Sequence, residues 1–283
     1  MAKTKTLWPN GARLALSLVV NVEEGSEMSI ARGDKGPEPV DELGVSLRQP
    51  IRNYGNESNY LYGINAASRV FGLIGGFGFK TTVTAAAQSL ENHPEVAKLI
   101  VTGGHETAAH GYRWVHQFRM DEEQERAFIR KAADSIEQTT GQRPYGWLSR
   151  YLHTERTRKL LAEEGYRYHM DDYSGDLPYK ARAGRRSIIV MPYALDTNDM
   201  KMWTDPAYTP DNWAKYACDS IYWMLREGRE TPQMLSIGLH LRIIGRPGRI
   251  AALERVLDHV RKSGEAIWVA GRNDIAERWE KMR

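Results

Sequence analysis

The stretch Arg13-Leu14-Ala15-Leu16-Ser17-Leu18-Val19-Val20-Asn21-Val22 is a nearly continuous run of apolar and β-branched residues with the length of one strand. Such a run is typical of a strand that is covered on both faces, as in a parallel sheet. It is followed at once by Glu23-Glu24-Gly25-Ser26-Glu27, and α/β proteins place catalytic groups at this end of a strand. The stretch therefore predicts a central strand that leads into an active site. The alternative is a solvated turn of charged residues.

Outward from this stretch, apolar runs of strand length alternate with segments of helical periodicity. Further strands are expected at residues 79–86, 146–149, 166–172, 187–193, 234–240 and 266–270. Helices are expected at residues 62–73, 92–100, 121–139, 154–164, 213–228 and 249–263. Residues 28–60 are rich in Gly, Pro, Asp and Asn, which predicts a long loop of the kind that often forms a lid. The alternation predicts an α/β fold, a distorted (β/α) barrel of about seven parallel strands.

Composition limits the class of protein. The 283 residues, of which 41% are hydrophobic, predict one domain over residues 1–283. The 39 basic and 36 acidic side chains are mixed along the chain, so nucleic acid is not an expected partner. Cys218 is the single cysteine, the first residues lack a secretory leader, and the apolar run at 14–22 is too short to span a bilayer. A soluble cytoplasmic protein without a membrane partner is expected.

A second stretch, Gly103-Gly104-His105-Glu106-Thr107-Ala108-Ala109-His110-Gly111-Tyr112-Arg113-Trp114, holds two histidines and a carboxylate within six residues. Histidine can act as metal ligand, base or acid near neutral pH. The alternative is a loop whose histidines only bond the backbone. No glycine-rich nucleotide motif follows any expected strand. Polar residues do recur at the expected strand ends, and we expect them to share one pocket: Glu23, Glu24, His105, His110, Arg143, Asp171 and His240.

This order of motifs resembles the polysaccharide deacetylase superfamily, whose members are distorted (β/α) barrels with an acidic first motif, a histidine second motif, an Arg-Pro third motif, an acidic fourth motif and a Leu-His last motif. The resemblance covers about residues 10 to 280. Within the superfamily, the stretches at 21–27, 104–114, 192–199 and 236–247 resemble the cytoplasmic branch of allantoinase-like and cyclic-imide-hydrolase-like proteins. The resemblance also implies a homo-oligomer, with a tetramer as the expected form.

The metal position departs from the secreted sugar deacetylases. Those enzymes carry an Asp-Asp first motif and a histidine four residues beyond the one that matches His110, whereas this chain has Glu23-Glu24 and Trp114. The resemblance makes Glu23 the base or a ligand, Glu24 its partner and His110 a ligand. An indole cannot coordinate a metal, so His105 would have to complete a zinc set of Glu24, His105 and His110. The sequence leaves open whether the protein binds one divalent metal or no cofactor at all.

The resemblance and the residue types together predict hydrolysis of a non-peptide C–N bond. Glu23 or Glu24 deprotonates the attacking water, and His240 protonates the departing nitrogen. Arg143 orients the carboxylate, and Asp171 belongs to the acidic fourth motif.

Tyr112 and Trp114 would give a flat apolar wall, with Asn198 as a further substrate contact. Such a wall suits a compact ring, so a small cyclic amide, imide or ureide is the expected substrate. The competing hypotheses are N-deacetylation of an acetylated amino sugar or linear amide, and a barrel that binds a ligand without turnover.

Overall fold

The computed structural model describes residues 8–42, 50–204 and 206–281. Strand β1 (Leu14–Val22) is buried along its whole length and has neighbouring strands on both of its edges. It pairs in parallel with β8 (Gln233–His240) along one edge, and with β2 (Thr82–Ala85) and β9 (Ile267–Val269) along the other. The apolar run therefore does form an interior strand that is buried on both faces, although its place in the strand order is next to the last strand, β8.

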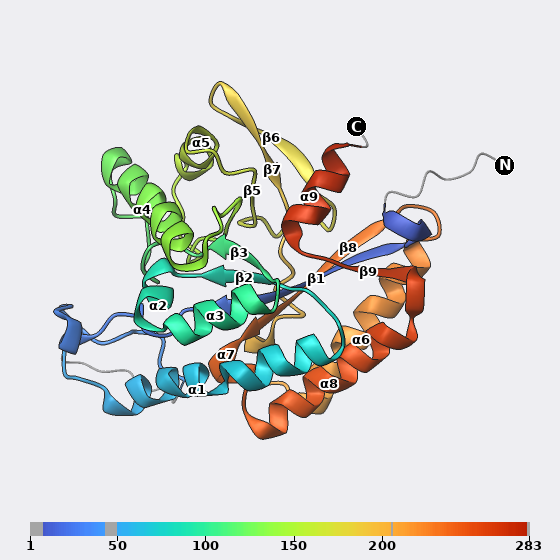
Figure 1. Ribbon diagram of the computed structural model, residues 1–283, viewed down its shortest axis with the longest axis horizontal. Coiled ribbons are helices and arrows are strands. Elements are labelled where there is room, and N and C mark those ends of the chain that lie inside the picture. Colours follow the sequence, from blue (N-terminus) through green and yellow to red (C-terminus); the bar gives the residue numbers. More distant parts are fainter. Residues whose placement is uncertain (1–7, 43–49, 205, 282–283) are drawn as a thin grey trace.

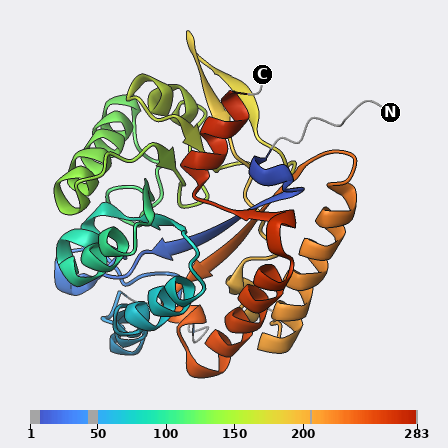
Figure 2. The same cartoon turned by 45° about the vertical axis from the view of Figure 1, so that its right-hand side comes forward.

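The sheet curls into a partly closed barrel (Figure 2). Its strand order is β6-β7-β5-β4-β3-β2-β1-β8, and all described pairings are parallel except the β6–β7 hairpin. The remaining strands are β3 (Glu106–Ala109), β4 (Gly146–Trp147), β5 (Tyr168–His169), β6 (Tyr179–Ala183) and β7 (Arg186–Val190). The expected distorted barrel of mostly parallel strands is confirmed. The polar edge strand β6 was not expected, because its sequence lacks an apolar run.

Helices cover the outer face of the curled sheet (Figure 1). They are α1 (Tyr54–Gly76), α2 (Ala87–Asn92), α3 (Pro94–Thr102), α4 (Glu122–Thr140), α5 (Thr157–Glu163), α6 (Pro210–Glu227), α7 (Leu241–Ile244), α8 (Pro247–Lys262) and α9 (Arg272–Glu280). Helix α1 begins inside the segment expected to be a loop, because the Asn53 side chain caps it by accepting from the Asn56 backbone N–H at 3.1 Å. Part of the expected lid, residues 43–49, lies outside the described residues.

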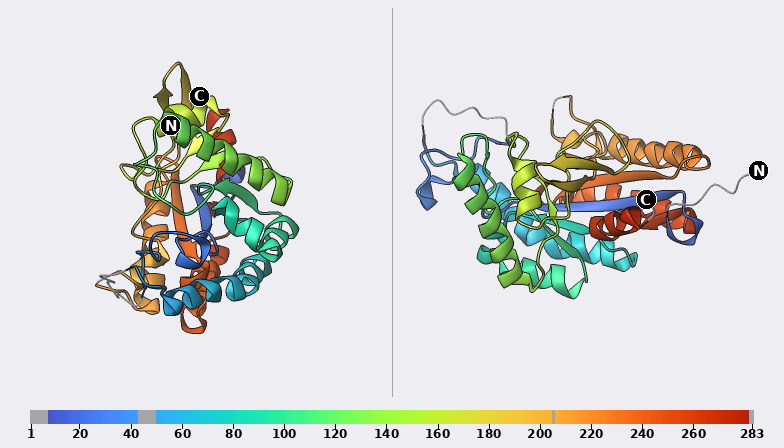
Figure 3. Two further views of the ribbon diagram at one scale, coloured as in Figure 1. Left: turned by 90° about the vertical axis from the view of Figure 1, so that its left-hand side faces the viewer. Right: turned by 90° about the horizontal axis from the view of Figure 1, so that it is seen from above.

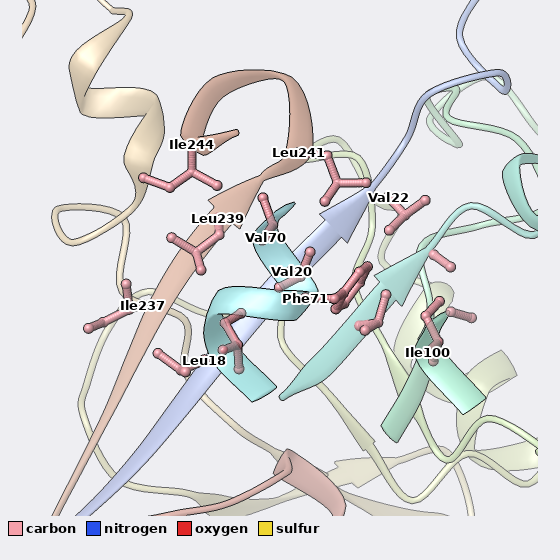
Figure 4. Packing of buried hydrophobic residues seen from close by; sticks show 14 of the residues in the cluster. Leu18, Val20, Val22, Val70, Phe71, Ile100, Ile237, Leu239, Leu241 and Ile244 are labelled. Carbon is pink, nitrogen blue, oxygen red and sulfur yellow. The ribbon is translucent and has the colours of Figure 1, made fainter. Parts of the chain in front are cut away.

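The core lies between β1, β8 and the helices (Figure 4). Leu18 and Val20 of β1 and Leu239 of β8 lie with Val70 and Phe71 of α1 in one buried cluster. The alternate residues of β1 face the barrel interior, so both faces of the strand are buried. No helix in the described part of the chain is long and apolar enough to cross a membrane.

The two ends of the barrel differ. Figure 3 shows α9 and the beginning of β1 at one end, and the loop that follows β1 at the other. Because the neighbouring strands run parallel to β1, the residues after β1, β3, β4 and β7 and the last residue of β8 meet at the second end. That end holds the candidate site.

Candidate active site

A cavity with an empty volume of about 390 Å³ opens at the carboxyl ends of the strands. Its polar groups follow directly from β1, β3, β4 and β8, as the parallel topology requires. Apolar and aromatic side chains from the intervening loops form the rest of its wall. The cavity is lined by Asn21, Glu23, His110, Trp114, Leu148, Ser149, Arg150, Tyr151, Tyr173, Tyr193, Leu195, Asn198, Met200 and His240.

Glu23 is the carboxylate at the centre of this cavity, and it is buried. Its Oε1 lies 3.3 Å from Nε2 of His110 and 3.4 Å from Nε2 of His240. Its Oε2 accepts a hydrogen bond from Nη1 of Arg242 at 2.7 Å. Burial by itself raises the pKa of Glu23, but Arg242 and then His240 outweigh burial and hold the pKa well below its usual range. Glu23 is therefore ionised at neutral pH.

His240 is held from behind by Asp199, which is fully buried at the start of a 3₁₀ turn, Asp199–Met202. The two oxygens of Asp199 accept from His240, one from Nδ1 and the other from the backbone N–H, each at 2.7 Å. Burial lowers the pKa of His240, but Glu23 and Asp199 raise it to about 10. The imidazole is therefore charged at neutral pH, with Nε2–H directed at Glu23.

His110 is fixed in a similar way by the backbone. Its Nδ1 donates to the carbonyl oxygen of Leu148 at 2.7 Å, which leaves Nε2 facing Glu23. The two histidines thus approach the same carboxylate oxygen. An acid, a carboxylate and a second imidazole lie within one small cavity, which is the set of groups that hydrolysis by activated water needs.

Arg242 joins the buried carboxylates behind the cavity. Besides Glu23, its Nε donates to Glu42 at 2.7 Å, and its Nη1 lies 3.5 Å from Glu24. The guanidinium also stacks over the ring of Tyr60, 4.4 Å from the centroid. This permanent charge at Glu23 is what keeps a fully buried carboxylate ionised.

Glu24 does not line the cavity. Its oxygens accept from two backbone N–H groups, that of Glu23 at 3.0 Å and that of Arg242 at 3.2 Å. Burial, opposed by Arg242 and reinforced by Glu23, raises its pKa to about 7. The sequence left Glu23 and Glu24 as alternative bases, and the geometry favours Glu23.

Trp114 and Asn198 line the cavity, where the sequence placed them. Arg150 stacks on the Trp114 ring, 3.7 Å from the centroid, and donates from Nη1 to the Trp114 carbonyl at 2.6 Å. The same guanidinium is paired with buried Glu38, in the loop after β1. The ion pair anchors that loop beside the indole.

Arg143, which was expected to orient the catalytic carboxylate, lies outside the cavity. Its Nη1 donates to Asp134 at 2.6 Å and Glu137 at 2.9 Å on α4, and its side chain is 38% exposed. It precedes β4 and therefore lies at the amino end of that strand, away from Glu23. The arginine that pairs with Glu23 is Arg242.

His105, which was expected to be a metal ligand, also lies outside the cavity, because it too precedes its strand. It precedes β3, its ring stacks on Phe71 at a centroid distance of 5.3 Å, and its Nδ1 accepts from the Thr81 backbone N–H at 3.3 Å. Strand β3 separates it from His110. The expected zinc set of Glu24, His105 and His110 is therefore not brought together.

Two further expected site residues lie outside the cavity. The hydroxyl of Tyr112 donates to Glu91 at 3.1 Å, and Lys131 Nζ lies 3.8 Å from the centre of its ring. Asp171 accepts from the backbone N–H and the hydroxyl of Ser149, at 2.8 and 2.9 Å, and so supports a residue of the cavity wall. Asp171 is thus placed to position Ser149 rather than to contact a ligand.

Asp199 and Arg242 were not among the residues predicted from the sequence. Asp199 does end the Asp196-Thr197-Asn198-Asp199 segment that supported the family resemblance, and Arg242 comes two residues after His240. Neither position has a local sequence pattern that predicts its contact with His240 or Glu23. Their roles depend on tertiary structure alone.

Glu23, His110 and His240 converge, but this donor set does not fit a divalent metal, because His240 carries a proton on the nitrogen that faces Glu23 and Arg242 already donates to the carboxylate. No group of three or more His, Cys, Asp or Glu side chains within residues 8–42, 50–204 and 206–281 is arranged to hold one. Trp114 stands where the resemblance to the sugar deacetylases would place a third ligand, and its indole has no free lone pair for a metal. The guanidinium of Arg242 already balances the charge of Glu23.

The chain is similar to known proteins along almost its whole length. A family model described as polysaccharide deacetylase matches residues 64–169. A Schizosaccharomyces pombe protein, provisionally named a polysaccharide deacetylase, is 32% identical over 298 residues, covering 96% of this chain and 92% of that protein.

Solved structures show the same similarity. The crystal structure of Puue allantoinase is 39% identical with a TM-score of 0.92, covering 100% of this chain and 95% of that one. A Pseudomonas aeruginosa structure, provisionally named a polysaccharide deacetylase, is 39% identical with a TM-score of 0.91, covering 97% of this chain and 93% of that one. A Clostridium thermocellum acetyl xylan esterase, in complex with a cobalt ion, is 12% identical with a TM-score of 0.52 and covers 92% of this chain and 89% of that one, so it shares the fold alone.

Proposed function

The chain belongs to the polysaccharide deacetylase family, and from that premise and the shape of its cavity we propose that it hydrolyses the C–N bond of a small cyclic amide, imide or ureide. One observation carries the choice of a ring. The reacting groups lie in a cavity of about 390 Å³ that is walled by Trp114, Tyr173 and Tyr193. Flat aromatic walls on several sides suit a compact and flat molecule.

The first step is attack by water on the ring carbonyl. Glu23 is the only one of the two adjacent glutamates that lines the cavity, and Arg242 keeps it ionised. It accepts a proton from water as the oxygen–carbon bond forms. His110 lies 3.3 Å from the same carboxylate oxygen, where it can hold the water or share the proton.

The second step is cleavage of the C–N bond. The departing nitrogen must gain a proton, and His240 is protonated because Glu23 and Asp199 raise its pKa to about 10. His240 gives that proton to the nitrogen as the ring opens. The products are a carboxylate and an amine, amide or urea nitrogen in one open chain.

A second candidate is removal of an acetyl group from an amino sugar or a linear amide. The exposed aromatic rings of Tyr151 and Tyr173 at the rim of the cavity favour it, since sugars stack on such rings. The names of the Schizosaccharomyces pombe and Pseudomonas aeruginosa proteins agree with this alternative.

The test is a hydrolysis screen followed by proton NMR. Purified protein is incubated with allantoin, hydantoin, dihydrouracil, succinimide and N-acetylglucosamine. Ring-opened product from at least one of the four rings, with no acetate from the sugar, is the expected result. Acetate release without any ring opening would replace the proposal by the second candidate.

The proposal also covers whether the reaction needs a metal cofactor. Because the donor set does not fit a divalent metal, we propose that Glu23, His110, His240 and Arg242 carry the reaction themselves. The single domain, the cytoplasmic location and the homo-oligomeric state expected from the sequence stay predictions. Size-exclusion chromatography with light scattering measures the last of them.

A further inference from the structure

Tyr193 follows β7 and projects into the cavity beside the catalytic groups. Its side chain is only 5% exposed, and its hydroxyl group lies against β8 so closely that a Cβ on Gly238 would come within 2.1 Å of it. Asn21, which bonds to this hydroxyl, is the register partner of His240. The hydroxyl is therefore held close to the end of β8 where His240 stands.

Both hydrogen-bond partners of the hydroxyl are donors. Nδ2 of Asn198 donates to it at 3.1 Å, and Nδ2 of Asn21 donates to it at 3.3 Å. The amide orientations are fixed by other bonds. The oxygen of Asn198 accepts from the Met200 backbone N–H at 2.8 Å, and that of Asn21 accepts from the Thr84 hydroxyl at 2.6 Å. Both Nδ2 groups must therefore face Tyr193.

The hydroxyl oxygen of Tyr193 accepts both of these hydrogen bonds. Its proton consequently has no acceptor among the described residues. Burial raises the pKa of Tyr193 above its usual range, so the group keeps this proton. A buried donor without an acceptor is costly unless a ligand completes it.

We propose that the Tyr193 hydroxyl donates its hydrogen bond to the carbonyl oxygen of the bound ring and to the oxyanion that forms there, an assignment that rests on the proposed function. Donors fixed in advance around a developing oxyanion are among the largest contributions to catalysis. Asn21 and Asn198 fix this one, since they hold its oxygen and leave only its proton free.

The step balances with groups already in the site. As the water oxygen bonds to the carbonyl carbon, the π pair moves onto the carbonyl oxygen, and the Tyr193 O–H bond stays intact while it donates. When the pair returns, the C–N bond breaks and the nitrogen takes its proton from His240.

The kinetic arm of the test compares Tyr193→Phe with Tyr166→Phe on whichever ring the wild-type protein hydrolyses. Tyr166 is a matched control, because it is also 5% exposed and its hydroxyl bonds to the Ile129 carbonyl at 3.3 Å outside the cavity. Loss of an oxyanion donor typically lowers kcat by about 10²- to 10³-fold, so that loss is expected for Tyr193→Phe alone. Equal, small losses in both variants would contradict the assignment.

A binding arm does not need turnover. Succinimide labelled with ¹³C at a carbonyl is bound to each protein at saturating concentration, and its carbonyl stretch is recorded by isotope-edited infrared spectroscopy. A band at lower wavenumber in the wild-type protein than in Tyr193→Phe is expected, because the donor weakens the C=O bond. Identical bands, or no band distinct from that of free succinimide, would overturn the assignment.

The kinetic and infrared experiments distinguish the role of Tyr193 from the proposed function. A shifted band without hydrolysis of any ring leaves Tyr193 as the carbonyl donor and refutes the proposed function. Ring hydrolysis with the same band in both proteins refutes the role of Tyr193 alone. If Tyr193→Phe does not fold, 3-fluorotyrosine at position 193 strengthens the donor instead. The carbonyl band must then move to a lower wavenumber than in the wild-type protein, and an unchanged band would contradict the assignment of Tyr193 as the donor.

Discussion

Replacement of Asp199 by Asn tests how His240 acquires its proton. Asp199 accepts two hydrogen bonds from His240, both at 2.7 Å, and Asn has nearly the same shape without the charge. Because Glu23 and Asp199 are the two charges that raise the pKa of His240 to about 10, the variant removes one of them and leaves the other.

The expected size of the effect follows from those bonds. A hydrogen bond to a charged group is worth about 1.5–3 kcal/mol, and one pH unit corresponds to about 1.4 kcal/mol. The pKa of His240 should therefore fall by about 1–2 pH units. The acid form is lost earlier as pH rises, so the alkaline limb of kcat/KM, expected near pH 10 in the wild-type protein, should move down by that amount. The maximum of kcat/KM should also fall by about 10²- to 10⁴-fold, because the amide holds the imidazole less well.

The assay is the pH profile of kcat/KM for ring hydrolysis, with thermal unfolding measured in parallel. Asp196→Asn is the matched control, since Asp196 belongs to the same segment but is exposed and accepts from the Tyr216 hydroxyl at 2.7 Å. An alkaline limb that stays in place in Asp199→Asn would refute the role given to this carboxylate. So would equal losses in the two variants.

Four other changes have definite expected outcomes. Arg242→Gln should lower the free energy of unfolding by about 3–5 kcal/mol in urea titrations, because it leaves buried carboxylates unpaired. It should also shift the acid limb of kcat/KM to higher pH, since Arg242 is the main group that lowers the pKa of Glu23. Arg143→Gln, on the outer surface, should keep kcat/KM within about twofold of wild type, as surface ion pairs are worth about 0–1 kcal/mol. Trp114→His should raise KM about tenfold or more through loss of an apolar wall, with no such rise if the indole is only scaffold. Dialysis against a chelator should leave kcat/KM unchanged, and a loss restored by zinc would contradict the absence of a metal step.

The sequence predicted β1 and the groups that directly follow a strand, because a strand buried on both faces has a recognisable composition. Glu23 and His110 come just after strands and His240 ends one, and all three lie in the cavity. Arg143 and His105 were grouped with them although each precedes its strand. In a parallel sheet that difference places a residue at the opposite end of the barrel.

Other features could not be read from local patterns. Asp199 and Arg242 reach His240 and Glu23 across 41 and 219 positions of the chain, and only the folded barrel brings such partners together. The start of α1 depends on the Asn53 cap within a stretch rich in loop-forming residues. Edge strand β6 depends on pairing with β7 rather than on burial of an apolar face.

The most direct test of the account is kcat/KM for ring hydrolysis by Glu23→Gln beside Glu24→Gln. Both residues are buried, adjacent and close to Arg242, but only Glu23 lines the cavity and contacts the two histidines. The account predicts that Glu23→Gln lowers kcat/KM by at least about 10²-fold, the usual cost of a missing general base, and that Glu24→Gln lowers it by less than about tenfold. A larger loss in Glu24→Gln than in Glu23→Gln, with both proteins folded, would contradict the assignment of Glu23 as the base.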